Sequence, residues 1–159
     1  MLAVAVTRRE RLAADGMSAR PRRRVAVLTC MDARIDPLEL LGLERGDAHV
    51  IRNAGGLATD DAIRSLSASQ RLLDTAEVVV VMHEDCGLLG SSEDEFTRAL
   101  AADGVLPSWR LGSFADLETA LQASLARLQA APELPSRDRI SGLIFDPATG
   151  TLREPGRDA

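Results

Sequence analysis

Four consecutive valines, Val78–Val81, constrain the fold of this chain more than any other feature of its sequence. β-Branched residues favour extended backbone, and a strand without polar positions is typical of a sheet that is covered on both faces. Such sheets are mainly parallel and carry helices on each side. The run therefore predicts a central strand from Glu77 to Met82, which leads the chain directly to His83.

Shorter apolar runs alternate with helix signals along the rest of the chain. Strands are expected over 25–29, 48–51 and 140–145, with a last hairpin strand at 151–152. Helices are expected over 37–41, 60–73, 92–102 and 113–130, the last with a stripe of leucines on one side. The sequence thus predicts an α/β fold, with a mainly parallel central sheet of about four strands plus a C-terminal hairpin strand, flanked by helices.

Size and charge exclude several classes of protein. With 159 residues, 45% of them apolar, the chain is expected to form one domain over 1–159, in which 1–24 is a helical and basic lead-in. A net charge of −5 argues against nucleic-acid binding. No apolar run approaches the roughly 18 residues of a membrane span. The two cysteines are too few for a disulfide scaffold, which favours a cytoplasmic location.

Two cysteines and a histidine stand where the sheet is expected to end. Cys30 closes the first strand, and His83 closes the third, with Cys86 three residues further on. Neighbouring parallel strands end at the same edge of a sheet, so these side chains can meet there. Two thiolates and one imidazole would hold a tetrahedral Zn²⁺ with an open fourth position, as in catalytic zinc sites. A lone buried cysteine is more often a small apolar residue, so Cys30 by itself predicts no metal.

The residues after Cys30 strengthen the metal interpretation. Asp32 and Arg34 place a carboxylate and a guanidinium two residues apart, where they can pair over the metal. The alternative is an ordinary surface salt bridge, which contributes almost nothing to stability.

Together these motifs resemble the β-class carbonic anhydrases. The resemblance rests on the Cys-x-Asp-x-Arg segment 30–34, the Arg-Asn-Ala-Gly-Gly loop 52–56, and the His-x-x-Cys segment 83–86 followed by Gly87. It extends from about residue 25 to residue 89, and the closing segment 142–150 looks like the family's last strand and hairpin. The short chain is similar to the compact subgroup of that family.

The resemblance implies a zinc enzyme that interconverts carbon dioxide and bicarbonate through zinc-bound hydroxide. Cys30, His83 and Cys86 would hold the metal, and Asp32 with Arg34 would form the catalytic dyad. The family also implies a homodimer or a multiple of dimers. Contact with the substrate is expected from three turn glycines: Gly55, Gly56 and Gly87.

Two other functions stay open at this point. Relatives on the same scaffold hydrolyse carbonyl sulfide or carbon disulfide, and the sequence barely separates these substrates from carbon dioxide. A non-enzymatic module, in which the cysteines form a disulfide or bind a structural metal, is the third hypothesis. Four polar residues near the motifs are interpreted as structural or as exposed turn positions rather than catalytic: His49, Arg52, Glu84 and Asp85.

Overall fold

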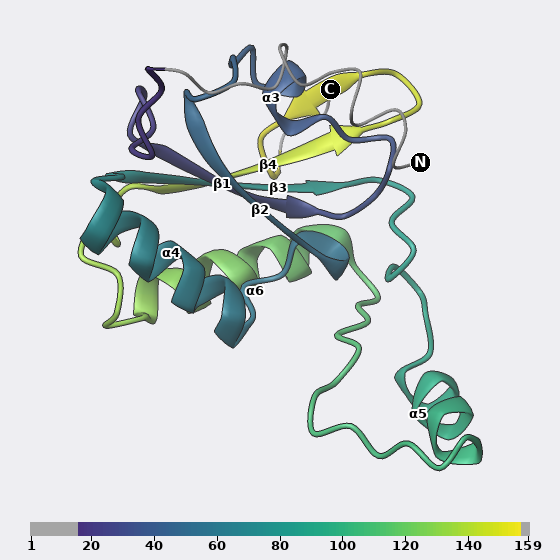
Figure 1. Cartoon of the computed structure of the whole chain (residues 1–159). Helices are drawn as coiled ribbons and strands as arrows, with labels where there is room; N and C mark the ends of the chain where they lie inside the picture. Colours follow the sequence, from purple (N-terminus) through teal and green to yellow (C-terminus); the bar gives the residue numbers. More distant parts are fainter. Residues whose placement is uncertain (1–15, 157–159) are drawn as a thin grey trace, which may run out of the picture.

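A single five-stranded sheet organises the chain, and the computed structural model describes residues 16–156 of it (Figure 1). The strand order is β2-β1-β3-β4-β5. The strands are β1 (Val25–Cys30), β2 (Ala48–Asn53), β3 (Glu77–His83), β4 (Ile140–Asp146) and β5 (Thr151–Arg153). The first four run parallel, and β5 returns antiparallel to β4. The expected fold, a mainly parallel sheet with a C-terminal hairpin, is therefore confirmed.

Helices cover both faces of the sheet. The described helices are α3 (Pro37–Leu40), α4 (Asp60–Leu73), α5 (Glu93–Ala102), which leaves the sheet, and α6 (Leu117–Ala130), with a short 3₁₀ turn, η1, at Ala54–Gly56. Figure 1 shows α4 and α6 side by side under one face and α3 on the other. Each long helix begins at a side-chain cap: Thr59 for α4, Ser92 for α5 and Asp116 for α6.

The four valines divide between two apolar clusters, as strand geometry requires. Val78 and Val80 face the larger cluster with Leu66 of α4 and Leu121 of α6. Val81 faces the opposite cluster, which also contains Cys30 and Cys86. The central strand is thus buried on both faces. The predicted leucine stripe of α6 belongs to the core, because its members lie in the larger cluster: Leu117, Leu121, Leu125 and Leu128.

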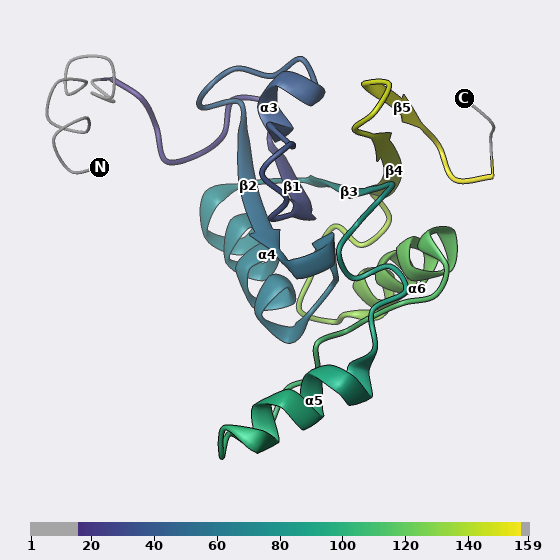
Figure 2. The ribbon, with the colours of Figure 1, turned by 90° about the vertical axis from the view of Figure 1, so that its right-hand side faces the viewer.

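One segment leaves this layered body. Residues 91–113, here called the arm, carry α5 away from the sheet, as the rotated view in Figure 2 shows. None of the residues of α5 is buried. The arm begins and ends at one point, because Leu89 and Phe114 form an isolated parallel bridge there.

The start of α6 and the N-terminal lead-in differ from the segments expected from the sequence. The last long helix begins at Leu117 rather than at 113, because Asp116 caps it and Phe114 pairs with Leu89. Of the expected lead-in 1–24, residues 1–15 lie outside the described part of the chain, and 16–24 form turns and bends before β1.

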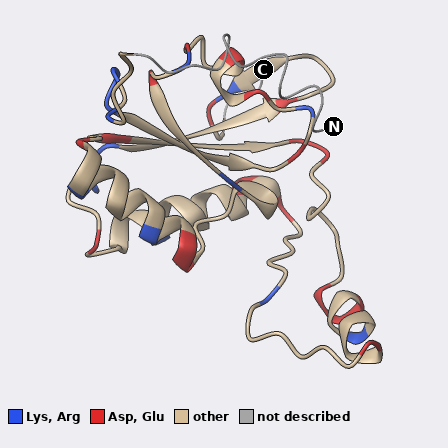
Figure 3. Ribbon diagram, viewed as in Figure 1, with Lys and Arg blue, Asp and Glu red and all other residues tan. Residues whose placement is uncertain are grey.

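Charged residues lie mainly in loops and at the ends of elements (Figure 3). Strand β1 has none, and β3 has only its first residue, Glu77. Within residues 16–156, no helix has both the length and the apolarity to cross a membrane.

Candidate metal centre

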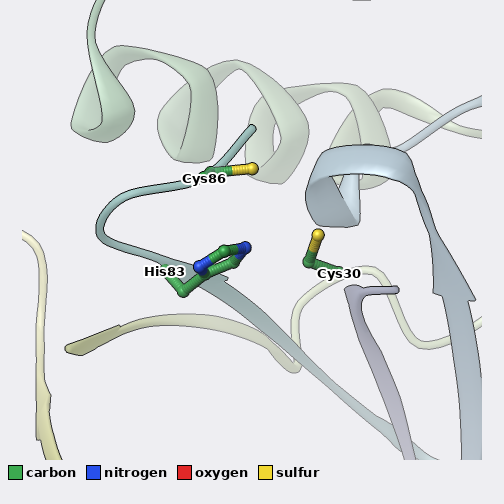
Figure 4. A group of neighbouring side chains, drawn as sticks. All are labelled: Cys30, His83 and Cys86. Carbon is green, nitrogen blue, oxygen red and sulfur yellow. The ribbon is translucent and has the colours of Figure 1, made fainter. Parts of the chain in front are cut away.

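The carboxyl ends of β1 and β3 bring Cys30, His83 and Cys86 together (Figure 4). Their ligand atoms, two Sγ and one imidazole nitrogen, all lie within 4.8 Å of one another. All three residues are buried, His83 completely. Figure 4 shows the two sulfur atoms and the ring facing a common space. The sheet edge predicted from sequence therefore does assemble this group.

The imidazole of His83 is oriented as a metal ligand would be. Its Nδ1 lies 2.9 Å from the carbonyl oxygen of Glu84, which can only accept, so Nδ1 carries the proton. Nε2 is then left with a free lone pair. In the described part of the chain, His83 Nε2 and Gln70 Nε2 are the buried side-chain nitrogen or oxygen atoms without a hydrogen-bond partner. Buried polar atoms are rarely left unpaired, and the lone pair of His83 Nε2, beside the two thiols, is available to a metal ion.

The donor set fits a soft divalent cation. Burial raises the pKa of the Cys86 thiol, and the neighbouring Cys30 adds to that effect. Two buried thiols beside an unpaired nitrogen form a site that a cation would stabilise, because it favours the thiolates and accepts the nitrogen lone pair. Sulfur and imidazole ligands favour zinc over magnesium or calcium.

A carboxylate is held next to the group by an arginine. Arg34 donates to both oxygens of Asp32, from Nε at 3.0 Å and from Nη2 at 2.8 Å. Its backbone amide donates to Asp32 Oδ1 at 2.9 Å. These bonds hold the pKa of Asp32 far below its usual range. The carboxylate is therefore ionised, and its Oδ2 lies 3.9 Å from His83 Nε2.

Arg34 also reaches the turn between His83, the last residue of β3, and Cys86. Its Nη1 donates to Asp85 Oδ2 at 2.9 Å, and its Nη2 donates to the Asp85 carbonyl at 3.0 Å. Asp85 was expected to be an exposed turn residue. Its side chain is exposed, but it is engaged with Arg34, a contact that the sequence analysis missed.

Arg52 near the end of β2 and Gly56 of η1 fix the end of β1. Arg52 donates from Nε to the Cys30 carbonyl at 2.9 Å and from Nη2 to the Asp32 carbonyl at 2.6 Å. A Cβ on Gly56 would come within 3.0 Å of the Cys30 amide nitrogen, and its φ of 66° also favours glycine. The structural interpretation of Arg52 agrees with these contacts.

An ion-pair network supports the carbonyl that orients His83. Arg153 of β5 binds Glu84 Oε1 at 2.9 Å and Glu118 Oε1 at 2.6 Å. The Glu84 amide also donates to the Phe145 carbonyl at 2.9 Å. Glu84 is thus held by its side chain and by its backbone amide, and no local pattern predicts this because Arg153 lies 69 residues away.

The remaining residues singled out from the sequence are two glycines, expected to contact substrate, and one histidine, expected to be structural. Gly55 is buried close to the metal-site loops, where a Cβ would meet Leu88 at 3.0 Å, whereas Gly87 is exposed. His49 is hydrogen-bonded to Ser69 Oγ at 2.7 Å and to the Ala19 carbonyl at 2.9 Å, which agrees with a structural histidine.

The chain is similar in sequence to carbonic anhydrases and to carbon disulfide hydrolases. The family model described as carbonic anhydrase matches residues 25–111. The β-carbonic anhydrase 1 of Mycobacterium tuberculosis is 44% identical over 135 residues, which cover 84% of this chain and 83% of that protein. A carbon disulfide hydrolase of Saccharolobus solfataricus is 36% identical over 158 residues, covering 84% of this chain and 78% of the relative.

Solved structures with a similar fold include a carbonic anhydrase and a carbon disulfide hydrolase. A carbonic anhydrase from Streptococcus mutans superposes with a TM-score of 0.84 at 38% identity, covering 97% of this chain and 96% of that one. The apo form of a carbon disulfide hydrolase superposes with a TM-score of 0.79 at 30% identity, covering 99% and 91%.

Proposed function

The chain belongs to the β-class carbonic anhydrases and is an enzyme of that class, and we propose that it uses zinc to interconvert carbon dioxide and bicarbonate. Cys30, His83 and Cys86 would be the ligands. The observation that carries the proposal is the buried, unpaired Nε2 of His83 beside two buried thiols. A zinc ion bound there would supply a Lewis acid that makes water more nucleophilic, although two thiolates would weaken it relative to a site of three histidines.

The protein's own residues then have separate tasks. The Glu84 carbonyl fixes the tautomer of His83 and leaves Nε2 free to bind the metal. The carboxylate of Asp32, kept ionised by Arg34, can only accept hydrogen bonds. Because its Oδ2 lies 3.9 Å from Nε2 of His83, it is suited to accept a hydrogen bond from the attacking water and so to orient that water toward the substrate.

The substrate would meet an apolar and tightly packed surrounding. Cys30 and Cys86 belong to a cluster against which Leu88 and Phe114 pack. Such a wall suits a small apolar molecule such as carbon dioxide and limits the entry of water. The proposed contacts of substrate with Gly55, Gly56 and Gly87 concern backbone groups, since these residues carry no side chain.

Metal analysis and a stopped-flow assay test the proposal together. We expect about one zinc per chain, as a mononuclear site requires, and hydration of carbon dioxide that is lost on chelation and restored by zinc. Zinc binding without turnover of any substrate would favour the structural metal module instead. A disulfide between Cys30 and Cys86 in the protein kept under cytoplasmic redox conditions would favour a redox module.

Hydrolysis of carbon disulfide or carbonyl sulfide is the second candidate. The relatives named carbon disulfide hydrolase support it, because they are up to 36% identical and align with 84% of this chain. The higher identity of 44% to β-carbonic anhydrase 1 favours carbon dioxide. The same zinc-loaded sample, assayed with all three substrates, distinguishes them by their kcat/KM values.

We also propose that the enzyme acts in the cytoplasm as a homodimer or a multiple of dimers. Two unbridged cysteines at the site favour a reducing compartment. The arm presents large apolar side chains to solvent, with Leu106 84% and Trp109 59% exposed, and a second copy of the chain could cover them. Light scattering should give an even number of chains, and Leu106→Asp should reduce that number if the arm is in the interface.

A further inference from the structure

One guanidinium, that of Arg34, binds Asp32 after β1 and Asp85 in the turn after β3. We propose that Asp85 is a positioning residue: it binds the Nη1–Nη2 edge of Arg34, adjacent to the Nε–Nη2 edge that binds Asp32, and so keeps the catalytic carboxylate in place. The inference rests on the proposed function, because it assigns Asp85 a part in that same site.

The contacts of Arg34 are divided between two segments that are distant in sequence. Two bonds go to Asp32, which follows β1, and two go to Asp85, which follows β3. Nη2 serves both, at 2.8 Å from Asp32 Oδ2 and at 3.0 Å from the Asp85 carbonyl. Four bonds from one planar group leave the guanidinium little freedom, because its donors form a rigid fork.

The backbone at Asp85 is shaped for this contact. Its φ of 53° is left-handed, a conformation that few residues other than glycine, asparagine and aspartate adopt readily. The conformation lies inside the turn from His83 to Cys86 and lets one residue offer both its carbonyl and its carboxylate to Arg34. The turn that spaces the two ligands therefore also supplies the anchor for the arginine.

Without that anchor, Arg34 would be held by Asp32 alone. The Arg34 side chain is 46% exposed, so a single partner would compete with water and with other rotamers of a flexible side chain. Asp32 would then lose its fixed direction whenever Arg34 moved. Because orientation rather than charge is lost, we expect a fall in kcat with little change in the substrate's KM.

The chain contains a closely matched control far from the site. Asp74 is also left-handed, with φ of 65°, and also binds an arginine through both its carbonyl and its carboxylate. Its partner is Arg24, with both distances at 3.0 Å. Asp74→Asn and Asp85→Asn thus make the same chemical change in the same local geometry. Asparagine tolerates the left-handed region, so both variants should fold.

The first measurement compares carbon dioxide hydration by these two variants, each loaded with zinc. Asp85→Asn should lower kcat about fivefold, the upper range for weakening one exposed charge pair, while Asp74→Asn should leave it unchanged. Asp85→Glu keeps the negative charge but places it one methylene farther from the backbone. It should therefore recover little of the lost kcat. Equal effects of Asp85→Asn and Asp74→Asn would overturn the proposal, because they would show a general effect on stability.

A double-mutant cycle tests whether Asp85 acts through Arg34. In the Arg34→Ala background, Asp85→Asn should have no further effect on kcat, since the residue that it holds is gone. Its full effect persisting in that background would overturn the proposal. Zinc content is measured for all four proteins, so that a loss of metal is not mistaken for a loss of orientation.

Hydrogen exchange at Arg34, measured by NMR, requires no enzymatic activity and therefore tests the role of Asp85 independently of the proposed function. The Arg34 Nε–H group should exchange slowly with solvent in the NMR spectrum of the intact protein, and Asp85→Asn, but not Asp74→Asn, should accelerate that exchange. If the wild-type protein hydrated no carbon dioxide, the proposed function would fail while this comparison still decided the role of Asp85. Unchanged Arg34 exchange in Asp85→Asn would overturn the role of Asp85 alone.

Discussion

The carboxyl end of the central strands and the arm 91–113 differ in how their residues are held. At the strand ends, Cys30, His83 and Cys86 are buried and are fixed by contacts from several parts of the chain. The arm buries none of the residues of α5. The two ends of the arm are joined within it by the carboxylate of Glu93, which accepts from the amides of Leu111 and Gly112 at 2.8 and 3.0 Å.

The two regions differ in how rigidly their surroundings hold them. A site that must hold three ligand atoms within 4.8 Å needs the rigidity of a sheet edge and of crossing hydrogen bonds. The arm has a weak apolar contact of its own, between the rings of Phe96 and Trp109 at 6.2 Å. We therefore expect single substitutions at the strand ends to have large effects on the reaction, and single substitutions in the arm to have small effects on it.

The largest effect is expected when a proposed ligand is replaced. Cys86→Ser keeps the size of the side chain but removes the soft thiolate donor, so the zinc content should fall well below one per chain. Activity should fall by roughly a thousandfold or more, because the Lewis acid is lost. Metal analysis and the stopped-flow assay measure both, with Arg98→Ala in the arm as the control. A Cys86→Ser protein with full zinc and normal turnover would refute the ligand assignment.

The next effect separates the dyad from the metal. Asp32→Asn retains the shape but not the charge of the carboxylate, and turnover should fall about a hundredfold, within the usual range for a positioned acid or base. Zinc content should not change. Asp146→Asn is the matched control, since Asp146 also accepts the amide of the residue two positions later, at 2.8 Å. Loss of zinc in Asp32→Asn would show that Asp32 supports the metal rather than the reaction.

A smaller effect is expected at the network behind His83. Arg153→Ala leaves the carboxylates of Glu84 and Glu118 without their shared cation, so the Glu84 carbonyl should orient His83 less well. Zinc affinity should fall about tenfold, the lower end for residues that support a ligand. Competition with a chelator measures it. Arg127→Ala, which removes an exposed ion pair with Asp60, is the control, and an equal loss there would contradict the role of Arg153.

Much of the fold and the ligand group followed from the sequence because they depend on local pattern. Val78–Val81 require a doubly covered strand, and adjacent parallel strands end together, which is enough to bring Cys30 and His83 to one edge. Periodicity and turn signals carry this information within a few residues of each element.

The supporting contacts could not be predicted in the same way. Asp85 reaches Arg34 only because the turn takes a left-handed backbone at that position, and aspartate in a sequence does not indicate this. Arg153 reaches Glu84 only after the C-terminal hairpin has paired with β4. Such contacts depend on tertiary geometry. The start of α6 was misplaced for a related reason, since the pairing of Phe114 with Leu89 keeps 113–116 out of the helix.

The smallest effect is expected in the arm and depends on pH. Although burial opposes its charge, the pKa of Glu93 is held below its usual value by the amides of Leu111 and Gly112, with Arg110 at 3.8 Å also contributing. A lowered folded-state pKa means that the stabilisation is present above about pH 4.3, the ordinary glutamate value, and is lost as the pH falls through the lower folded value. The arm should therefore open in acid while the sheet stays closed.

Hydrogen exchange measures this opening directly. Protection of the Leu111 and Gly112 amides should decrease several-fold as the pH falls below about 4, while protection of the β3 amides should not. Glu93→Gln should remove that pH dependence, because glutamine has no charge to lose, and turnover at neutral pH should be unchanged. Asp94→Asn in the same helical turn is the control. Loss of β3 protection in parallel with that of the arm would mean that the two regions open together, and the contrast between them would then be wrong.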